Sequence, residues 1–168
     1  MSADIAAVAA ALVGGGAAVI PTDTVYGLAA APAHALALFE LKGRPSEKAI
    51  PVLAADGAQL ADVVTIDAAA AALAHDLWPG PLTLVLPRNP DFGADLGGDD
   101  PSTVAVRVPA HPVALELLRA TGPLAVTSAN LSGEPPSTTL AEAQSVFGER
   151  VDAYLDGGAC DGEPSTVL

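Results

Sequence analysis

Three of the chain's seven lysines and arginines fall close together, at Lys42, Arg44 and Lys48. Gly43 is expected to end a helix, and Pro45 favours an extended backbone at Arg44, so Lys42 and Arg44 can face one point beyond the helix end. A planar guanidinium beside a mobile ammonium suits a triphosphate. The sequence contains no P-loop pattern, so such a site would be made of side chains. The alternative is a helix end that merely carries basic residues against its dipole.

Hydroxyl groups follow a short apolar strand in the segment 21–27. If this segment is extended, Thr22, Thr24 and Tyr26 point to one side, at a strand end where ligands of α/β sheets gather. The alternative is an edge strand whose threonines simply suit a pleated surface.

Arg107 is the one charged residue in the otherwise apolar stretch 104–108. A buried guanidinium needs a ligand or a partner, so the residue predicts either an anion site or an ion pair with a carboxylate. Ser128 and Asn130 follow another apolar stretch and would share a face if extended. They could hold substrate oxygens, or they could bond the backbone of their own turn.

Other chemistries find little support. His34, His75 and His111 lack the spacing of metal ligands, and no Gly-x-Ser-x-Gly elbow occurs. Cys160 stands outside any motif, so an inert or structural role is expected, and as a single cysteine it fits a reducing, cytoplasmic setting.

The net charge is −13, with twenty Asp and Glu against seven Lys and Arg. Proteins that neutralise many phosphates need a basic face, so extensive nucleic-acid binding is not expected. We expect neither a signal peptide nor a transmembrane helix, because no basic stretch precedes an apolar one and no apolar run is long enough.

Strands and helices alternate along the chain, which predicts one α/β domain spanning residues 1–168. Two neighbouring strands flank a Pro- and Gly-rich loop at 89–102, so the sheet should be mixed. The expected helices cover 4–13, 32–42, 67–76, 113–120 and about 139–147. The expected strands cover 17–20, 50–53, 82–86, 104–108 and 124–127, with short ones at 151–155 and 165–168.

These motifs occur in the order found in the YrdC family, which the chain resembles over nearly its whole length. The matching segments are 21–28, 42–45 with Lys48, 78–83, 106–109, 127–133 and 164–167. The family's Lys-x-Arg and Ser-x-Asn signatures fall on Lys42, Arg44, Ser128 and Asn130. Family members commonly continue past the last segment with another strand and a further arginine, whereas this sequence ends at Leu168.

The resemblance implies a twisted mixed sheet with surrounding helices and a concave central cleft. It also implies an L-threonylcarbamoyladenylate synthase, a nucleotidyltransferase that uses L-threonine, bicarbonate or carbon dioxide, and ATP with Mg²⁺. A downstream transferase would carry the threonylcarbamoyl group to tRNA, with little direct tRNA binding by this chain. The implied catalytic residues are Lys42 and Arg44. The implied threonine-binding residues are Thr22, Tyr26, Arg107, Ser128 and Ser165. The implied ATP-binding residues are Lys42, Arg44, Ser46, Thr103, Asn130 and Thr138; no metal ligand is assigned.

Two other functions fit the same residues. The fold could serve as an RNA-binding module whose cleft cations contact phosphates, although the acidic charge disfavours this. A related nucleotide-binding enzyme could use a different acceptor, which the motifs alone do not separate from the synthase.

Overall fold

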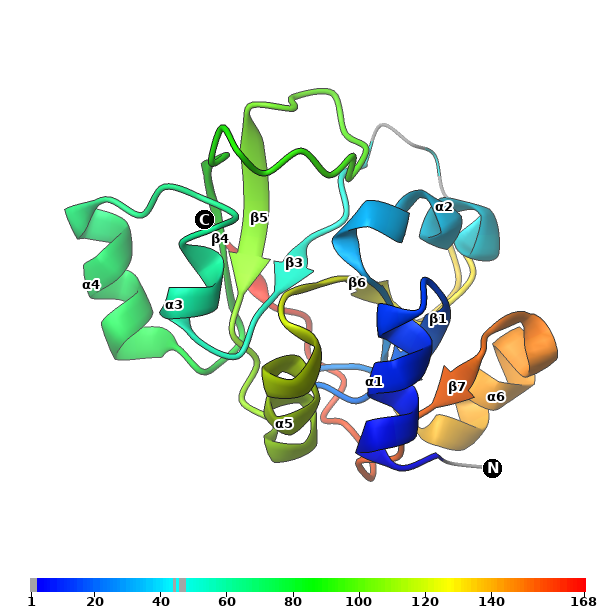
Figure 1. Ribbon diagram of the computed structural model, residues 1–168. Helices are drawn as coiled ribbons and strands as arrows, with labels where there is room; N and C mark the ends of the chain where they lie inside the picture. Colours follow the sequence, from blue (N-terminus) through cyan, green and yellow to red (C-terminus); the bar gives the residue numbers. More distant parts are fainter. Residues whose placement is uncertain (1–2, 44, 46–47) are drawn as a thin grey trace.

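Within the described residues of this computed structural model (3–43, 45 and 48–168), eight strands form one mixed sheet at the centre of the protein (Figure 1). Their order across the sheet is β7-β1-β2-β6-β3-β5-β4-β8. The strands are β1 (Ala17–Ile20), β2 (Gly27–Ala30), β3 (Val52–Leu53), β4 (Leu82–Pro87), β5 (Thr103–Arg107), β6 (Leu124–Ser128), β7 (Ala153–Tyr154) and β8 (Thr166–Val167).

The prediction of a mixed sheet is confirmed. Four neighbouring pairs run antiparallel, among them β2 with β6 and β4 with β5 across the predicted loop. Three pairs run parallel: β1 with β7, β3 with β5, and β4 with β8.

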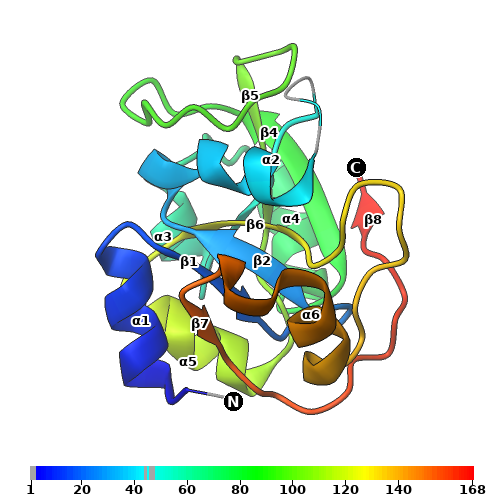
Figure 2. The same ribbon diagram turned by 90° about the vertical axis from the view of Figure 1, so that its right-hand side faces the viewer.

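Helices cover both faces of the sheet (Figures 1 and 2). The α-helices are α1 (Ile5–Val13), α2 (Leu36–Lys42), α3 (Gly57–Leu60), α4 (Ala68–Leu77), α5 (Pro112–Thr121) and α6 (Leu140–Phe147), with 3₁₀ turns η1 (Pro32–His34) and η2 (Gly148–Arg150). Helices α1 and α5 pack side by side over one face, and α2 and α6 contribute to the core on the other.

The strand residues alternate between these two cores. In β1, Val19 joins the core on the α2 side and Ile20 joins the core on the α1 side, and both are fully buried. Alternation of this kind follows from the pleat, which sends successive side chains to opposite faces. Both faces are covered, so β1, β2 and β3 carry no polar side chain.

The structure corrects three element predictions. The helix expected over 32–42 is broken into η1 and α2 at Ala35, whose backbone N–H bonds Pro32 O in a 3₁₀ pattern. Strand β2 was not predicted, because its Gly-Leu-Ala-Ala sequence has low strand propensity and is held by its two neighbours. Helix α3 was also missed, although Asp56 caps it through Gln59.

No helix in the described part of the chain is long and apolar enough to cross a membrane.

Candidate active site

A cavity of about 440 Å³ opens over the sheet face that α1 and α5 partly cover. Its polar lining comes from Thr22, Thr24, Tyr26, Thr83, Arg107, Thr127, Ser128 and Ser165. Its apolar lining includes Pro51, Leu53 and Val126. All five side chains expected to hold threonine therefore surround one cavity.

The strand register explains how these distant residues meet. Leu53 pairs with both Arg107 on β5 and Leu124 on β6, and Ser128 pairs with Gly27 on β2. Paired residues share a face, and alternate residues along β6 keep to it. Arg107 on β5 and Ser128 on β6 thus lie on one face, at opposite ends of two strands that β3 separates, with Val126 between them.

The segment between β1 and β2 turns instead of staying extended, which corrects the geometry expected for it. Thr22 Oγ1 donates to Val25 O at 2.6 Å and accepts from the Thr24 and Val25 amides at 3.2 and 3.3 Å. This hydroxyl-centred turn competes with a strand ladder. Thr22, Thr24 and Tyr26 still reach the same cavity, but through the turn.

Arg107 is buried, with 6% of its surface exposed. Its Nε donates to Gly80 O at 3.1 Å, its Nη1 donates to Thr24 Oγ1 at 3.2 Å, and its Nη2 forms an ion pair with Asp23. Burial lowers the pKa of Arg107 from its ordinary value, and the Asp23 carboxylate opposes that shift. Of the two alternatives for this residue, the ion pair is present, and the guanidinium also lines the cavity.

Lys42 lies behind the cavity wall in a buried polar network. Its Nζ donates to Ser128 O at 2.6 Å, to Ser128 Oγ at 3.2 Å and to Asn130 Oδ1 at 3.0 Å. Ser128 Oγ donates to Asn130 Oδ1 at 2.5 Å. The structure therefore brings Lys42, from the predicted Lys-x-Arg signature, together with Ser128 and Asn130 of the predicted Ser-x-Asn signature.

Tyr26 is fully buried and its hydroxyl contacts the chain beyond β7. It donates to Gly158 O at 2.7 Å, accepts from the Gly157 amide at 3.1 Å and lies 3.2 Å from Asp156 Oδ1. Burial, chiefly, raises the pKa of Tyr26 to about 12. The phenol is therefore protonated at neutral pH.

The remaining predicted residues lie elsewhere or outside the described chain. Thr103 begins β5, and Thr138 borders a separate hollow where its amide and hydroxyl contact Glu142 Oε2. Arg44 and Ser46 lie outside the described residues. Ser165 lines the cavity, with its Oγ 2.9 Å from Thr83 Oγ1.

Sequence reasoning missed two participants, Asp23 and Thr83. Asp23 stands in the middle of the hydroxyl-rich segment, but it lies 84 positions before Arg107 in the sequence, which gave no sign of their pairing. Thr83 follows the turn that contains Gly80. A Cβ on Gly80 would lie 2.4 Å from Leu77 O, so this turn, whose carbonyl holds Arg107, requires glycine.

Among the described residues, no group of three His, Cys, Asp or Glu side chains could hold a metal ion. Cys160 is half-buried, with its Sγ 3.2 Å from Thr22 O, and burial raises the pKa of this thiol. A raised thiol pKa fits the inert role expected for it.

Comparison with protein families gives a match over residues 10–168 to the Sua5/YciO/YrdC family model, which is described as telomere recombination. A putative threonylcarbamoyl-AMP synthase of Mycobacterium tuberculosis H37Rv is 40% identical over 154 residues, covering 89% of this chain and 70% of the relative. A threonylcarbamoyl-AMP synthase of Idiomarina loihiensis is 42% identical, covering 88% of this chain and 83% of the relative.

Among solved structures, Pyrococcus abyssi Sua5 in complex with L-threonine superposes with a TM-score of 0.92 at 37% identity. The match covers 97% of this chain and 49% of that chain, so this chain corresponds to about half of Sua5.

Proposed function

The chain belongs to the Sua5/YciO/YrdC family, and we propose that it forms threonylcarbamoyl-AMP and pyrophosphate from L-threonine, bicarbonate or carbon dioxide, and ATP. The observation that carries this proposal is the cavity itself. It combines a buried arginine with several hydroxyl groups, in a fold that superposes on a threonine-bound Sua5.

Threonine needs a partner for its carboxylate, and Arg107 offers one. Three of the five N–H groups of a guanidinium are used by Gly80, Thr24 and Asp23 within the described chain, which leaves two to bind a carboxylate. Asp23 and Gly80 fix the plane of the guanidinium, so little ordering is lost when substrate binds. The hydroxyls of Ser128 and Ser165 supply further polar contacts from the same cavity.

The reaction joins two anions, so positioning and charge dominate its barrier. The threonine amine adds to carbon dioxide and releases a proton, giving a carbamate. A carbamate oxygen then bonds to the α-phosphorus of ATP while the bond to the pyrophosphate oxygen breaks. Lys42 places a buried positive charge one hydrogen bond behind Ser128 at the cavity wall, and we assign it, with Arg44 and Asn130, to the ATP side.

Magnesium is proposed to enter as the complex of Mg²⁺ with ATP. The described acidic side chains offer no cluster for a resident ion, and a nucleotide-bound Mg²⁺ is held largely by phosphates and water. The product would pass to a transferase that modifies a tRNA adenosine, which places the proposed reaction in the cytoplasm.

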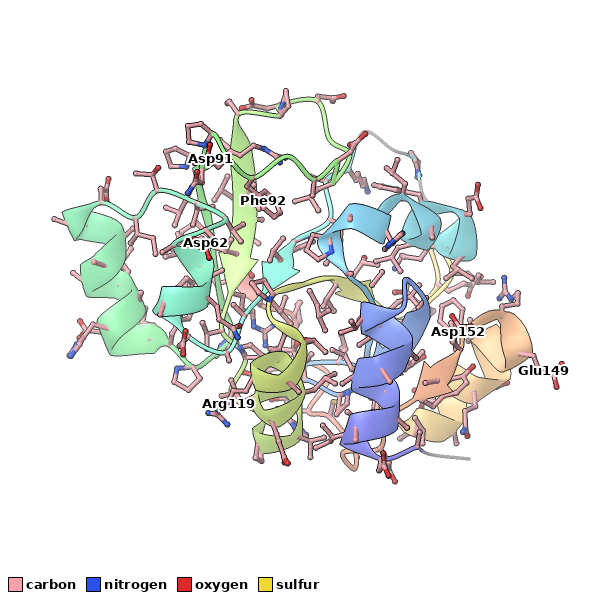
Figure 3. All side chains as sticks on the ribbon, in the orientation of Figure 1. Asp62, Asp91, Phe92, Arg119, Glu149 and Asp152 are labelled. Atoms are coloured by element: carbon pink, nitrogen blue, oxygen red, sulfur yellow. The ribbon has the colours of Figure 1, made fainter. Side chains whose placement is uncertain are left out.

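The test is an assay with ATP, Mg²⁺, bicarbonate and labelled threonine that measures pyrophosphate and labelled adenylate. The variants are Arg44→Ala and a matched control, Arg119→Ala, whose side chain points away from the protein on α5 (Figure 3). We expect product that requires threonine, undiminished in the control and reduced about 100-fold or more in Arg44→Ala.

Pyrophosphate release that ignores threonine would overturn the proposal. Product formed equally well with serine or carbamoyl phosphate in place of threonine would point to the related enzyme with a different acceptor.

A further inference from the structure

Residues 156–165, which we term the tail strap, run from β7 to β8 beside the segment that follows β6 (Figure 2). The strap forms one wall of the cavity through Gly162, Pro164 and Ser165. None of its residues is fully buried. Because it buries little apolar surface, the strap depends on hydrogen bonds for its position, as segments that open locally do.

Those hydrogen bonds are concentrated at a few points. The Cys160 amide donates to Thr138 O at 2.8 Å, and the Gly162 amide donates to Thr24 O at 2.8 Å. At the start of the strap, the Tyr26 hydroxyl bonds both Gly158 O and the Gly157 amide. The Tyr26 side chain both lines the cavity and donates a hydrogen bond to the strap backbone.

Tyr26 is itself held firmly. Its backbone amide donates to Ser137 O at 2.9 Å, and its carbonyl accepts from the Ala129 amide at 2.8 Å. Its ring is fully buried in the core. The hydroxyl therefore stands at a fixed point against which the more exposed strap can be placed.

We propose that Tyr26 is a positioning residue whose hydroxyl holds the tail strap closed over the cavity and thereby sets the affinity for threonine. The proposal rests on the proposed function for its substrate. Tyr26 acts through the strap: with its hydroxyl removed, Gly158 O and the Gly157 amide lose their partner, the strap opens more often, and Ser165 leaves the cavity wall.

The chain supplies its own reporter and its own control. Cys160 is the single cysteine, lies on the strap and is half-buried against Thr22, so the rate at which it reacts with a thiol reagent measures strap opening. Tyr154 is the only other tyrosine. Its hydroxyl also donates to a glycine carbonyl, Gly148 O at 2.7 Å, away from the cavity lining. Tyr154→Phe therefore removes an equivalent hydrogen bond outside the strap.

The experiment measures Cys160 reactivity in wild type, Tyr26→Phe and Tyr154→Phe, with thermal unfolding to confirm that each is folded. We expect Cys160 in Tyr26→Phe to react about tenfold faster, the size expected when a hydrogen-bonded hydroxyl is lost, and Cys160 in Tyr154→Phe to react as in wild type. Added L-threonine should slow the reaction of Cys160 with the thiol reagent in wild type. If Tyr26→Phe does not fold, Asp156→Ala tests the same turn, because the exposed Asp156 carboxylate accepts the Gly158 amide at 2.9 Å.

Kinetics separate positioning from general damage. We expect the threonine KM of Tyr26→Phe to rise about tenfold, with the ATP KM and kcat changed less than about twofold. Equal Cys160 reactivity in folded Tyr26→Phe and Tyr154→Phe would overturn the strap proposal. If wild type forms no adenylate but Cys160 still reacts faster in Tyr26→Phe than in Tyr154→Phe, the proposed function is rejected. The role of Tyr26 in holding the strap is then still supported.

Discussion

At the residue scale, the pair Arg107–Asp23 defines the charge of the cavity. Both side chains are largely buried, with exposed side-chain fractions of 7% and 13%. The guanidinium is compensated before any ligand arrives, so it can be retained in the interior without a substrate. A carboxylate ligand then binds the two remaining N–H groups of the guanidinium. It does not have to neutralise an isolated charge.

Arg107→Ala should destabilise the protein by about 3 kcal/mol, because it leaves the Asp23 carboxylate buried without its partner. Chemical unfolding in urea measures this loss. The double variant Asp23→Ala with Arg107→Ala should cost less than the sum of the single variants, since the unpaired charge is then absent.

The matched control is Arg119→Ala, which removes an exposed arginine and should change stability by less than about 0.5 kcal/mol. A loss in Arg107→Ala no larger than in this control would show that the ion pair contributes nothing to the fold.

At the element scale, strand β2 pairs with β6, and residues of both strands line the cavity. Gly27 opens the strand and pairs with Ser128, and a Cβ on Gly27 would lie 2.5 Å from Val126 Cγ1. The close approach of the two strands therefore depends on the absence of a side chain at Gly27.

Gly27→Ala should destabilise the protein by about 1–3 kcal/mol through overpacking. Gly57→Ala is the control, because a Cβ there meets nothing within 4 Å at the start of α3. It should be neutral or stabilise by up to about 1 kcal/mol. Thermal or urea unfolding of the two variants distinguishes them.

Adding Val126→Ala to Gly27→Ala should recover part of the loss, because it removes the atom that clashes. If Val126→Ala recovers no stability, or if Gly27→Ala and Gly57→Ala are equally stable, β2 and β6 shift apart without cost.

At the scale of the whole molecule, acidic side chains are spread over the exterior. Asp62 and Asp91 lie at the left of Figure 3, Glu149 lies at the right beside α6, and all three are exposed. Among the described cations, Lys42 and Arg107 are buried. Such a surface repels a polyanion and favours solubility.

We therefore predict that tRNA binds more weakly than about 10 μM at about 150 mM salt. A filter-binding or fluorescence titration at several salt concentrations measures this. Tight binding that weakens steeply with salt would instead favour the RNA-binding module.

The sequence by itself determined the mixed α/β class, most of the elements and the residue types of the cavity, because strand alternation, Asp caps and Gly-Pro turns are local signals. Thr22, Tyr26, Arg107, Ser128 and Ser165 could be named as a set, since their motifs resemble those of a known family. Tertiary structure alone decided that Asp23 pairs with Arg107 and that Gly158 O accepts a hydrogen bond from the Tyr26 hydroxyl. These pairings depend on sheet register and chain crossing between residues more than 80 positions apart, which no local pattern encodes.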